Sequence, residues 1–346
     1  MPKISIVAPV YGVEKYIDQF LESIRRQTFR DFEIILVDDG SKDNCPSILD
    51  VFSKEDDRYH VIHQSNRGVA VARNTGLCQI LGEYVYIVDS DDWLEPTALE
   101  VLWNEAQRTN ADLIYGDWIS EQEMTSVLQR VFNKPFVTEN QDVIDALQFA
   151  VNGNNFKIRL QNSLFDEINH LGGAPWRCMI KTSLIMDNNL RFDPYVRGLG
   201  DDILFFLHLY EYVKKVAYVP RVIYHYRKLS TSYSHGYKEN YIDSISRILE
   251  KQEEFLKIYN KGELAWKSYY MRVLIYLQQG MERYFKNDGN LKPEKERYLE
   301  FKKLLKTQPY RDAIKKAPLS MIGNRRLKYA MVLLKFSLYR GYWRFV

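Results

Sequence analysis

Cysteine is scarce in this chain of 346 residues, and its three cysteines, Cys45, Cys78 and Cys178, show no metal-ligand spacing. A small, odd number of cysteines argues against a disulfide framework and a zinc site, and it favours a reducing compartment. Long apolar runs are also absent: the run from Tyr329 to Leu334 stops at Lys335, far short of the roughly 20 residues that a membrane-spanning helix needs. The first residues, MPKISIVAPV, lack the pattern of a secretory signal. We therefore expect a cytoplasmic protein that does not cross a membrane.

Acidic residues are nearly missing from the end of the chain. From Lys302 onward there are 12 Lys and Arg and one acid, Asp312, whereas the preceding 301 residues carry 36 basic and 44 acidic residues. A basic tail on an acidic body usually indicates an anionic partner surface, either nucleic acid or phospholipid. The tail contains no recognisable nucleic-acid module, which favours phospholipid.

What the sequence does contain is a regular alternation of short apolar runs and helical segments over residues 3–117. The expected strands are Ile4–Val10, Phe32–Val37, Tyr59–His63, Tyr84–Val88 and Asp112–Tyr115. The expected helices between them are Glu14–Gln27, Cys45–Ser53, Val69–Leu81 and Pro96–Thr109. This alternation predicts an α/β fold with a mostly parallel sheet flanked by helices. Ligands of such sheets bind beyond the carboxyl ends of the strands.

Two of those strand ends carry clustered carboxylates. Asp38-Asp39-Gly40-Ser41 follows the second run, and Asp89-Ser90-Asp91-Asp92 follows the run YVYIV. Carboxylates that meet at one edge of a sheet repel each other, and a divalent cation relieves that repulsion. Mn²⁺ and Mg²⁺ suit such hard oxygen ligands and bind them together with substrate phosphates. The alternative for the second cluster is an Asx turn followed by a helix N-cap.

Four segments together carry a resemblance to a known family: VAPVYGVEKYI, QTFRDFEIILVDDGSKD, NRGVAVARNTGL and YVYIVDSDDWLEP. They span roughly residues 1–120 and resemble the family 2 glycosyltransferases, which have the GT-A fold. No G-x-G-x-x-G follows the first strand, which disfavours a dinucleotide-binding dehydrogenase. A nucleotidyltransferase usually has a glycine-rich basic loop at that position, whereas this chain has Tyr11-Gly12-Val13-Glu14.

The resemblance implies a site for a nucleotide-sugar at these strand ends. Its nucleotide-binding residues would be Pro9, Val10, Tyr11, Glu14, Asp39, Asn66, Arg73, Asp89 and Ser90. In the family the acid that matches Asp39 hydrogen-bonds the base, and a carboxylate there accepts from uracil N3–H, which favours UDP. Arg73 would neutralise phosphate charge or, alternatively, form a structural ion pair.

The resemblance also implies a metal site and a general base. Asp91, with Asp89 beside it, would hold Mn²⁺ or Mg²⁺ against the diphosphate and stabilise the leaving group. Asp201 and Asp202 begin a helix after the glycine-containing stretch that starts at Arg197, and they match a Glu-Asp pair of the family. We expect Asp202 to be the base, with Asp201 as the alternative, although both could simply cap the helix.

Two later segments also resemble the family. GAPWRCMIK resembles an acceptor-side stretch, in which Trp176 could stack on a sugar. YHYR, with Ser230 and Ser232 beyond it, resembles a strand and loop that close near the diphosphate, and its His225 and Arg227 are further candidates for the acceptor side. Core packing is the alternative for Trp176 and His225.

The basic tail has a helical pattern. Leu327, Met331, Leu334 and Leu338 form one apolar stripe within Arg325–Arg340, and five cations lie elsewhere on the helix. We expect an amphipathic helix lying on an anionic membrane surface. The alternative is a helix that packs on the body of the protein.

The sequence thus predicts three parts: a Rossmann-like nucleotide-sugar-binding half over 1–120, an acceptor-binding half over 121–235, and a helical C-terminal region over 236–346. The expected function is an inverting, metal-assisted transfer of a hexosyl or N-acetylhexosaminyl group. The donor would be a UDP-sugar and the acceptor a glycan or lipid-linked hydroxyl at the inner face of the cell membrane. A non-catalytic nucleotide-sugar-binding or membrane-docking protein on the same fold is the alternative.

Overall fold

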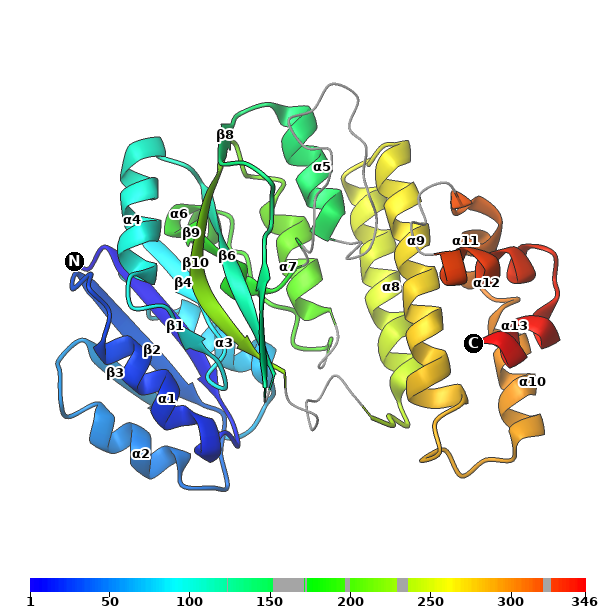
Figure 1. Ribbon diagram of the computed structural model, residues 1–346, viewed down its shortest axis with the longest axis horizontal. Helices are drawn as coiled ribbons and strands as arrows, with labels where there is room; N and C mark the ends of the chain where they lie inside the picture. Colours follow the sequence, from blue (N-terminus) through cyan, green and yellow to red (C-terminus); the bar gives the residue numbers. More distant parts are fainter. Residues whose placement is uncertain (123, 152–170, 172, 197–199, 229–235, 320–324) are drawn as a thin grey trace. The chain divides into compact units, whose positions relative to one another are not determined.

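The computed structural model describes residues 1–122, 124–151, 171, 173–196, 200–228, 236–319 and 325–346. The chain divides into two compact units, Met1–Gln148 with Asn169–Leu229, and Phe149–Ile168 with Ser230–Val346. The first unit contains the sheet and its flanking helices. The second is helical over its described residues (Figure 1).

Over the described residues the first unit has a ten-stranded mixed sheet of order β3-β2-β1-β4-β9-β6-β10-β5, with β7 paired to β6 and β8 to β10. Its strands are β1 (Ile4–Val10), β2 (Phe32–Asp38), β3 (Tyr59–His63), β4 (Tyr84–Ile87), β5 (Trp93–Leu94), β6 (Leu113–Gln122), β7 (Thr125–Gln129), β8 (Phe136–Thr138), β9 (Cys178–Lys181) and β10 (Val216–Arg227). β3, β2, β1 and β4 run parallel, as do β6 and β10, and the antiparallel β9 lies between β4 and β6. The expected α/β fold is confirmed.

The helices of the first unit follow the expected alternation. They are α1 (Glu14–Arg25), α2 (Cys45–Phe52), α3 (Val69–Leu77), α4 (Ala98–Thr109), α5 (Gln141–Val151), which crosses the boundary between the units, α6 (Thr182–Asp187) and α7 (Asp201–Leu209). Right-handed crossovers place α1 and α2 on one face of the sheet and α3 on the other, where α3 contacts β1 and β2. Strands covered on both faces are mostly apolar, and every residue of β2 is buried, including Glu33 and Asp38.

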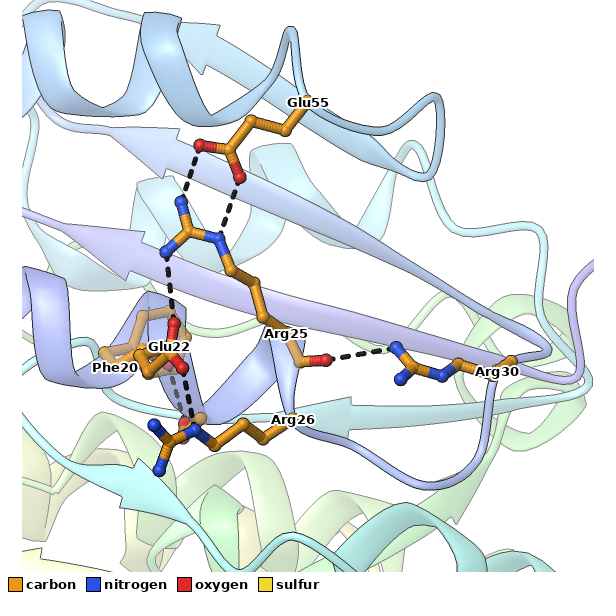
Figure 2. A network of polar contacts seen from close by, with 7 residues as sticks. Phe20, Glu22, Arg25, Arg26, Arg30 and Glu55 are labelled. Atoms are coloured by element: carbon orange, nitrogen blue, oxygen red, sulfur yellow. Dashed lines mark hydrogen bonds and ion pairs between the residues drawn. The ribbon is translucent and has the colours of Figure 1, made fainter.

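A group of ion pairs on the surface joins the end of α1 to the end of α2. Arg25 binds both oxygens of Glu55, at 2.8 and 2.6 Å, and Arg26 binds Glu22 at 2.7 Å (Figure 2). Exposed pairs of this kind contribute little stability each. They lie at the end of α1 opposite Glu14. The Glu14 end of the helix is the one that faces the candidate site described below.

The second unit contains α8 (Tyr241–Ile258), α9 (Glu263–Gly280), a π-helix (Met281–Phe285), α10 (Glu294–Leu304), α11 (Tyr310–Lys316), α12 (Arg325–Lys335) and α13 (Tyr339–Phe345). Among the described residues, no helix combines the length and the apolar character needed to span a bilayer.

The basic tail differs from the single helix expected over Arg325–Arg340. α12 stops at Lys335, Ser337 adopts φ +57°, and α13 then begins. Met331 and Leu334 are buried, because α12 packs against α11 and α13. Part of the apolar stripe, Met331 and Leu334, therefore packs inside the helical unit, whereas Leu338 is 54% exposed. The exposed residues of the segment are Arg325, Arg326, Lys328, Tyr329, Lys335, Phe336, Ser337, Leu338 and Arg340.

Candidate active site

The ends of three parallel strands meet at one edge of the sheet. Val10 at the end of β1 pairs with Asp38 at the end of β2, and the Asp39 N–H donates to the Val10 carbonyl at 2.9 Å. Ser90, just beyond β4, donates its Oγ hydrogen to the Pro9 carbonyl at 2.7 Å. The structure thus brings residues 9–11, 38–41 and 89–92 together.

Asp39 anchors the loop that leads into α3. Its Oδ1 accepts from Gln64 Nε2 at 2.7 Å and from the Arg67 N–H at 2.9 Å, and its Oδ2 accepts from the Gly68 N–H at 2.7 Å. A carboxylate has about four lone-pair positions, so one of them is left for a hydrogen bond from a ligand. The sequence did not reveal this anchoring role.

The other predicted nucleotide-side residues differ in how open they are. Tyr11 is 54% exposed and Asn66 is exposed, so both side chains can meet a ligand. The Val10 side chain is fully buried, which leaves only its backbone. The Glu14 carboxylate accepts from the backbone N–H and the side-chain amide of Asn44, at 3.1 and 2.5 Å, and so holds the turn before α2.

The acidic loop of residues 89–92 concentrates negative charge. Burial, and after it the charge of Asp89, raise the pKa of Asp91 to about 6. Asp92 is fully buried, and burial followed by the charges of Asp91 and Asp89 raises its pKa well above the ordinary range. These shifts show that ionised carboxylates are unfavourable here without a compensating cation.

Arg227 at the end of β10 makes several contacts with the acidic loop. The Arg227 backbone N–H donates to Asp92 Oδ1 at 2.7 Å, and its Nε donates to the Asp91 carbonyl at 2.9 Å. Its guanidinium also lies over the Trp93 ring, 4.7 Å from the centroid. The structure therefore places Arg227 against the acidic loop.

Arg73 on α3 connects the acidic loop to the start of α7. Its two terminal nitrogens bind Asp89 Oδ1 at 2.9 Å and Asp201 Oδ2 at 3.2 Å, and its side chain is only 8% exposed. Arg73 is therefore an ion-pair partner, the alternative that the sequence left open. Because Arg73 binds both carboxylates, Asp201 lies close to Asp89, one of the two acids that the sequence suggested as metal ligands.

The two acids of α7 have different surroundings. Burial is the largest influence on the pKa of Asp201 and raises it; Arg73 lowers it and the Asp202 charge raises it. Asp202 is half-buried, and its Oδ1 accepts from the Ile203 N–H at 2.7 Å. Burial lowers the pKa of Arg177 to about 10, and the Asp202 charge opposes that shift most strongly. Sequence reasoning missed Arg177, although it lies within one of the resembling segments.

The predicted acceptor-side aromatics belong mostly to the interior. Trp176 is buried and stacks on Tyr224 with ring centroids 4.6 Å apart, so core packing describes it. His225 has Nδ1 2.8 Å from a Glu121 oxygen and Nε2 2.9 Å from a Glu95 oxygen. Residues 197–199 and the serines Ser230 and Ser232 lie outside the described residues.

Asp89 and Asp91 are a plausible pair of metal ligands on chemical grounds. Over the described residues, no group of three or more His, Cys, Asp or Glu side chains could hold an ion by itself. Mg²⁺ and similar ions commonly bind one or two carboxylates and take their remaining ligands from substrate phosphates and water. Burial, and after it the charge of Asp89, raises the pKa of Asp91, and a bound cation would favour the ionised carboxylate.

Residues 5–170 match the sequence model of glycosyl transferase family 2. The chain is also 31% identical over 265 residues to the putative glycosyltransferase EpsH of Bacillus subtilis, across 76% of this chain and 71% of that protein. This chain belongs to glycosyltransferase family 2. The resemblance of its first four motifs is thereby confirmed.

Other members of family 2 are similar to this chain. The poly(ribitol-phosphate) β-N-acetylglucosaminyltransferase TarP of Staphylococcus aureus is 30% identical over 207 residues, which is 59% of this chain and 56% of TarP. The crystal structure of S. aureus TarS 1–349 in complex with UDP-GlcNAc superimposes with a TM-score of 0.65 at 19% identity, covering 99% of this chain and 90% of that one. That similarity supports the GT-A fold.

Proposed function

We propose that this family 2 glycosyltransferase transfers a hexosyl or N-acetylhexosaminyl group from a UDP-sugar to a hydroxyl of a glycan or lipid-linked acceptor, with inversion. The observation that carries the proposal is the Arg73 bridge, which holds Asp89 and Asp201 on one guanidinium. Asp89, which we assign to the diphosphate side, therefore shares a cation with Asp201 of α7. The neighbouring TarS complex with UDP-GlcNAc supports the uridine donor.

The donor would lie along the edge formed by the ends of β1, β2 and β4. Tyr11 offers an open ring for the base, and Asp39 has one lone-pair position left for uracil N3–H. Asp91 and Asp89 would hold Mn²⁺ or Mg²⁺ at the diphosphate. A bound ion of this kind stabilises the charge that develops on the departing diphosphate.

Asp202 is the proposed general base. Its carboxylate takes the proton of the acceptor hydroxyl while that oxygen forms a bond to the anomeric carbon. The bond from that carbon to the diphosphate breaks, and its electron pair stays on the departing oxygen. Because the acceptor oxygen enters opposite the departing one, the configuration at that carbon is inverted. Asp201 is less suited because it is buried and paired with Arg73.

The donor site can be tested by calorimetric titration of UDP and GDP with Mn²⁺ or with EDTA. We expect tight UDP binding only with Mn²⁺, and loss of that dependence in Asp91→Asn. Asp56→Asn is the matched control, because Asp56 pairs with Arg58 at 2.6 Å away from the acidic loop. Equal binding by wild type and Asp91→Asn would contradict the metal role, and preference for GDP would contradict the uridine donor.

The base can be tested with two asparagine variants. Asp202→Asn should retain UDP binding and lose transfer to acceptor, by roughly 100-fold or more. If Asp201→Asn lost transfer while Asp202→Asn kept it, the assignment would be reversed. If wild type and both variants bound UDP but none of them transferred a sugar, the non-catalytic alternative would be supported.

We also propose that the C-terminal basic surface, formed by the exposed cations and apolar residues of 325–340, docks on the anionic inner face of the cell membrane. Exposed Tyr329, Phe336 and Leu338 lie among the cations, a combination that suits an anionic lipid interface. Co-sedimentation with anionic vesicles should fall when Arg325, Lys328 and Arg340 are changed to Glu.

The control for that experiment changes Lys251, Lys257 and Lys267 to Glu. These lysines lie on α8 and α9, and the change alters the net charge by the same amount. Equal pelleting of the two triple variants would show that docking does not depend on the C-terminal basic surface.

A further inference from the structure

Tyr224 lies behind the acidic loop, in the interior of the sheet. It belongs to β10, pairs with Leu94 of β5 and Trp118 of β6, and is fully buried. Its ring stacks almost parallel on Trp176, at 4.6 Å and an interplanar angle of 6°. The position of its hydroxyl is therefore set by the packing of the core.

That hydroxyl connects the two ends of the acidic loop. The backbone N–H of Asp89 donates to the Tyr224 oxygen at 3.1 Å, and the Tyr224 hydroxyl donates to Asp92 Oδ2 at 2.8 Å. The Asp89 carbonyl is a more distant acceptor, at 3.4 Å. A hydroxyl has one hydrogen to donate, and a carboxylate oxygen at the shorter distance is the stronger acceptor.

The rest of the loop is tied down as well. Ser90 Oγ donates to the Pro9 carbonyl, and Arg227 Nε donates to the Asp91 carbonyl. Within the loop the Asp92 N–H donates to the Asp89 carbonyl at a long 3.4 Å, and the Tyr224 hydroxyl adds a side-chain connection between the same two residues.

We infer that Tyr224 is a positioning residue, which sets the spacing of Asp89 and Asp91 by fixing Asp89 and Asp92 from the core. The inference rests on the proposed function, since it gives the loop its role toward the metal and the diphosphate. Partners that orient metal-binding groups typically change metal affinity by about 10–100-fold when they are removed. Tyr224 never needs to touch the donor to have that effect.

Tyr224→Phe tests the inference, because it keeps the stacked ring and removes only the hydroxyl. Tyr84→Phe is the matched control: Tyr84 is a buried strand tyrosine whose hydroxyl donates to the Ala111 carbonyl at 2.9 Å. Both variants lose one interior hydrogen bond, and only Tyr224 contacts the acidic loop. UDP affinity is measured by calorimetry with Mn²⁺ and with EDTA, and thermal unfolding is recorded for each protein.

We expect Tyr224→Phe to weaken Mn²⁺-dependent UDP binding by about 10-fold or more, with UDP binding in EDTA unchanged. Tyr84→Phe should bind as wild type does, even where its unfolding temperature falls as far. Equal affinities for the two variants would overturn the inference while leaving the proposed function standing. A wild type whose UDP binding ignores Mn²⁺ would overturn the proposed metal role and the inference together.

Asp92→Asn provides a second, independent measurement. Its side-chain oxygen can still accept from the Arg227 N–H, but the amide nitrogen that then faces Tyr224 can only donate, so the hydrogen bond from the Tyr224 hydroxyl to residue 92 is lost. We expect the same loss of Mn²⁺-dependent affinity. This variant decides the question if Tyr224→Phe does not fold, and wild-type affinity in Asp92→Asn would then overturn the inference.

Discussion

Replacing Arg73 by Met tests the contact that joins the two halves of the site. Met has a similar length and no charge, so the substitution removes one cation from two carboxylates, Asp89 and Asp201. Both ion pairs involve a side chain that is only 8% exposed. Water cannot replace the lost partner effectively at such a position, so the remaining carboxylates become uncompensated charges.

The size of the effect follows from that burial. Removing one partner of a buried ion pair typically destabilises a protein by about 3–5 kcal/mol. For a unit of about 200 residues, this free energy corresponds to a fall in Tm of roughly 6–20 °C. Arg73→Lys should recover only part of the loss, because an ammonium is a point charge that cannot bridge two carboxylates as the guanidinium does.

The pH dependence of the Arg73→Met effect gives a second check. Burial already raises the pKa of Asp201, and Arg73 opposes that shift. Without Arg73 the pKa of Asp201 rises further, and the folded state binds a proton that the unfolded state has released. The penalty of the mutation should therefore be small near pH 4 and grow as the pH rises to 8.

Thermal or urea unfolding of wild type and variants at pH 5 and pH 8 makes the measurement. Arg108→Met is the control, since Arg108 forms an exposed pair with Glu105 on the surface of α4, and we expect its Tm to match wild type. An Arg73→Met protein as stable as wild type at pH 8 would refute the argument that the bridge carries buried charge.

Three further predictions concern single positions around the site. Gly40 (φ +72°) and Gly12 (φ +66°) have similar backbones, but a Cβ added at Gly40 would lie 2.8 Å from the Asn66 backbone nitrogen, whereas one at Gly12 would meet nothing within 4 Å. Urea unfolding should therefore show Gly40→Ala to be less stable than Gly12→Ala by about 1–2 kcal/mol. Equal stability of the two variants would contradict the clash. A hydrogen bond to Asp38, and then one to Asp50, raise the pKa of His63 from 6.5. The Tm advantage of wild type over His63→Gln should therefore be full below pH 6.5 and vanish as the pH rises through the raised pKa. An advantage that is constant from pH 6 to 9 would show that the interaction of His63 with these carboxylates does not stabilise the fold. The pKa of Asp91 is about 6, so protons compete with the metal for its carboxylate as the pH falls. Mn²⁺-dependent UDP affinity, measured by calorimetry, should therefore fall about fourfold from pH 7.5 to 5.5. An unchanged affinity would contradict a metal-binding role for Asp91.

The first 115 residues could be predicted well from the sequence because their signals are local. A continuous apolar run such as Ile4–Val10 can only be a strand buried on both faces, and β1 has the predicted bounds. The acids that follow β2 and β4 then meet at one edge, since parallel strands share the direction of their carboxyl ends. For this reason the positions of Asp39, Asp89 and Asp91 followed from the strand pattern.

The later part of the site depends on contacts between distant segments, which no local pattern encodes. Arg73 and Asp201 are 128 positions apart in the chain, and only the fold shows that they meet. Trp176 likewise looked like a possible sugar platform, but the stacked ring of Tyr224 places it in the core. Met331 and Leu334 of the tail do pack inside the helical unit, but the stripe does not continue along one helix to Leu338, and the packing of α12 against α11 and α13 could not be seen in the spacing.

The charge at this edge of the sheet also bears on why the chain keeps so many buried polar contacts there. The pKa of Asp91 is about 6 and the pKa of Asp92 is also raised well above its ordinary value, so at neutral pH each ionised carboxylate makes the folded state less stable than it would be with neutral side chains. A sequence selected for stability alone would lose these acids, and Tyr224 and Arg227 would have no charge to support. A cation and a diphosphate that bind only the folded protein would reverse this cost. Acids with raised pKa values that are held in place by buried donors are therefore a physical argument, besides the resemblance in sequence, for the ligand site that we propose at residues 89–92.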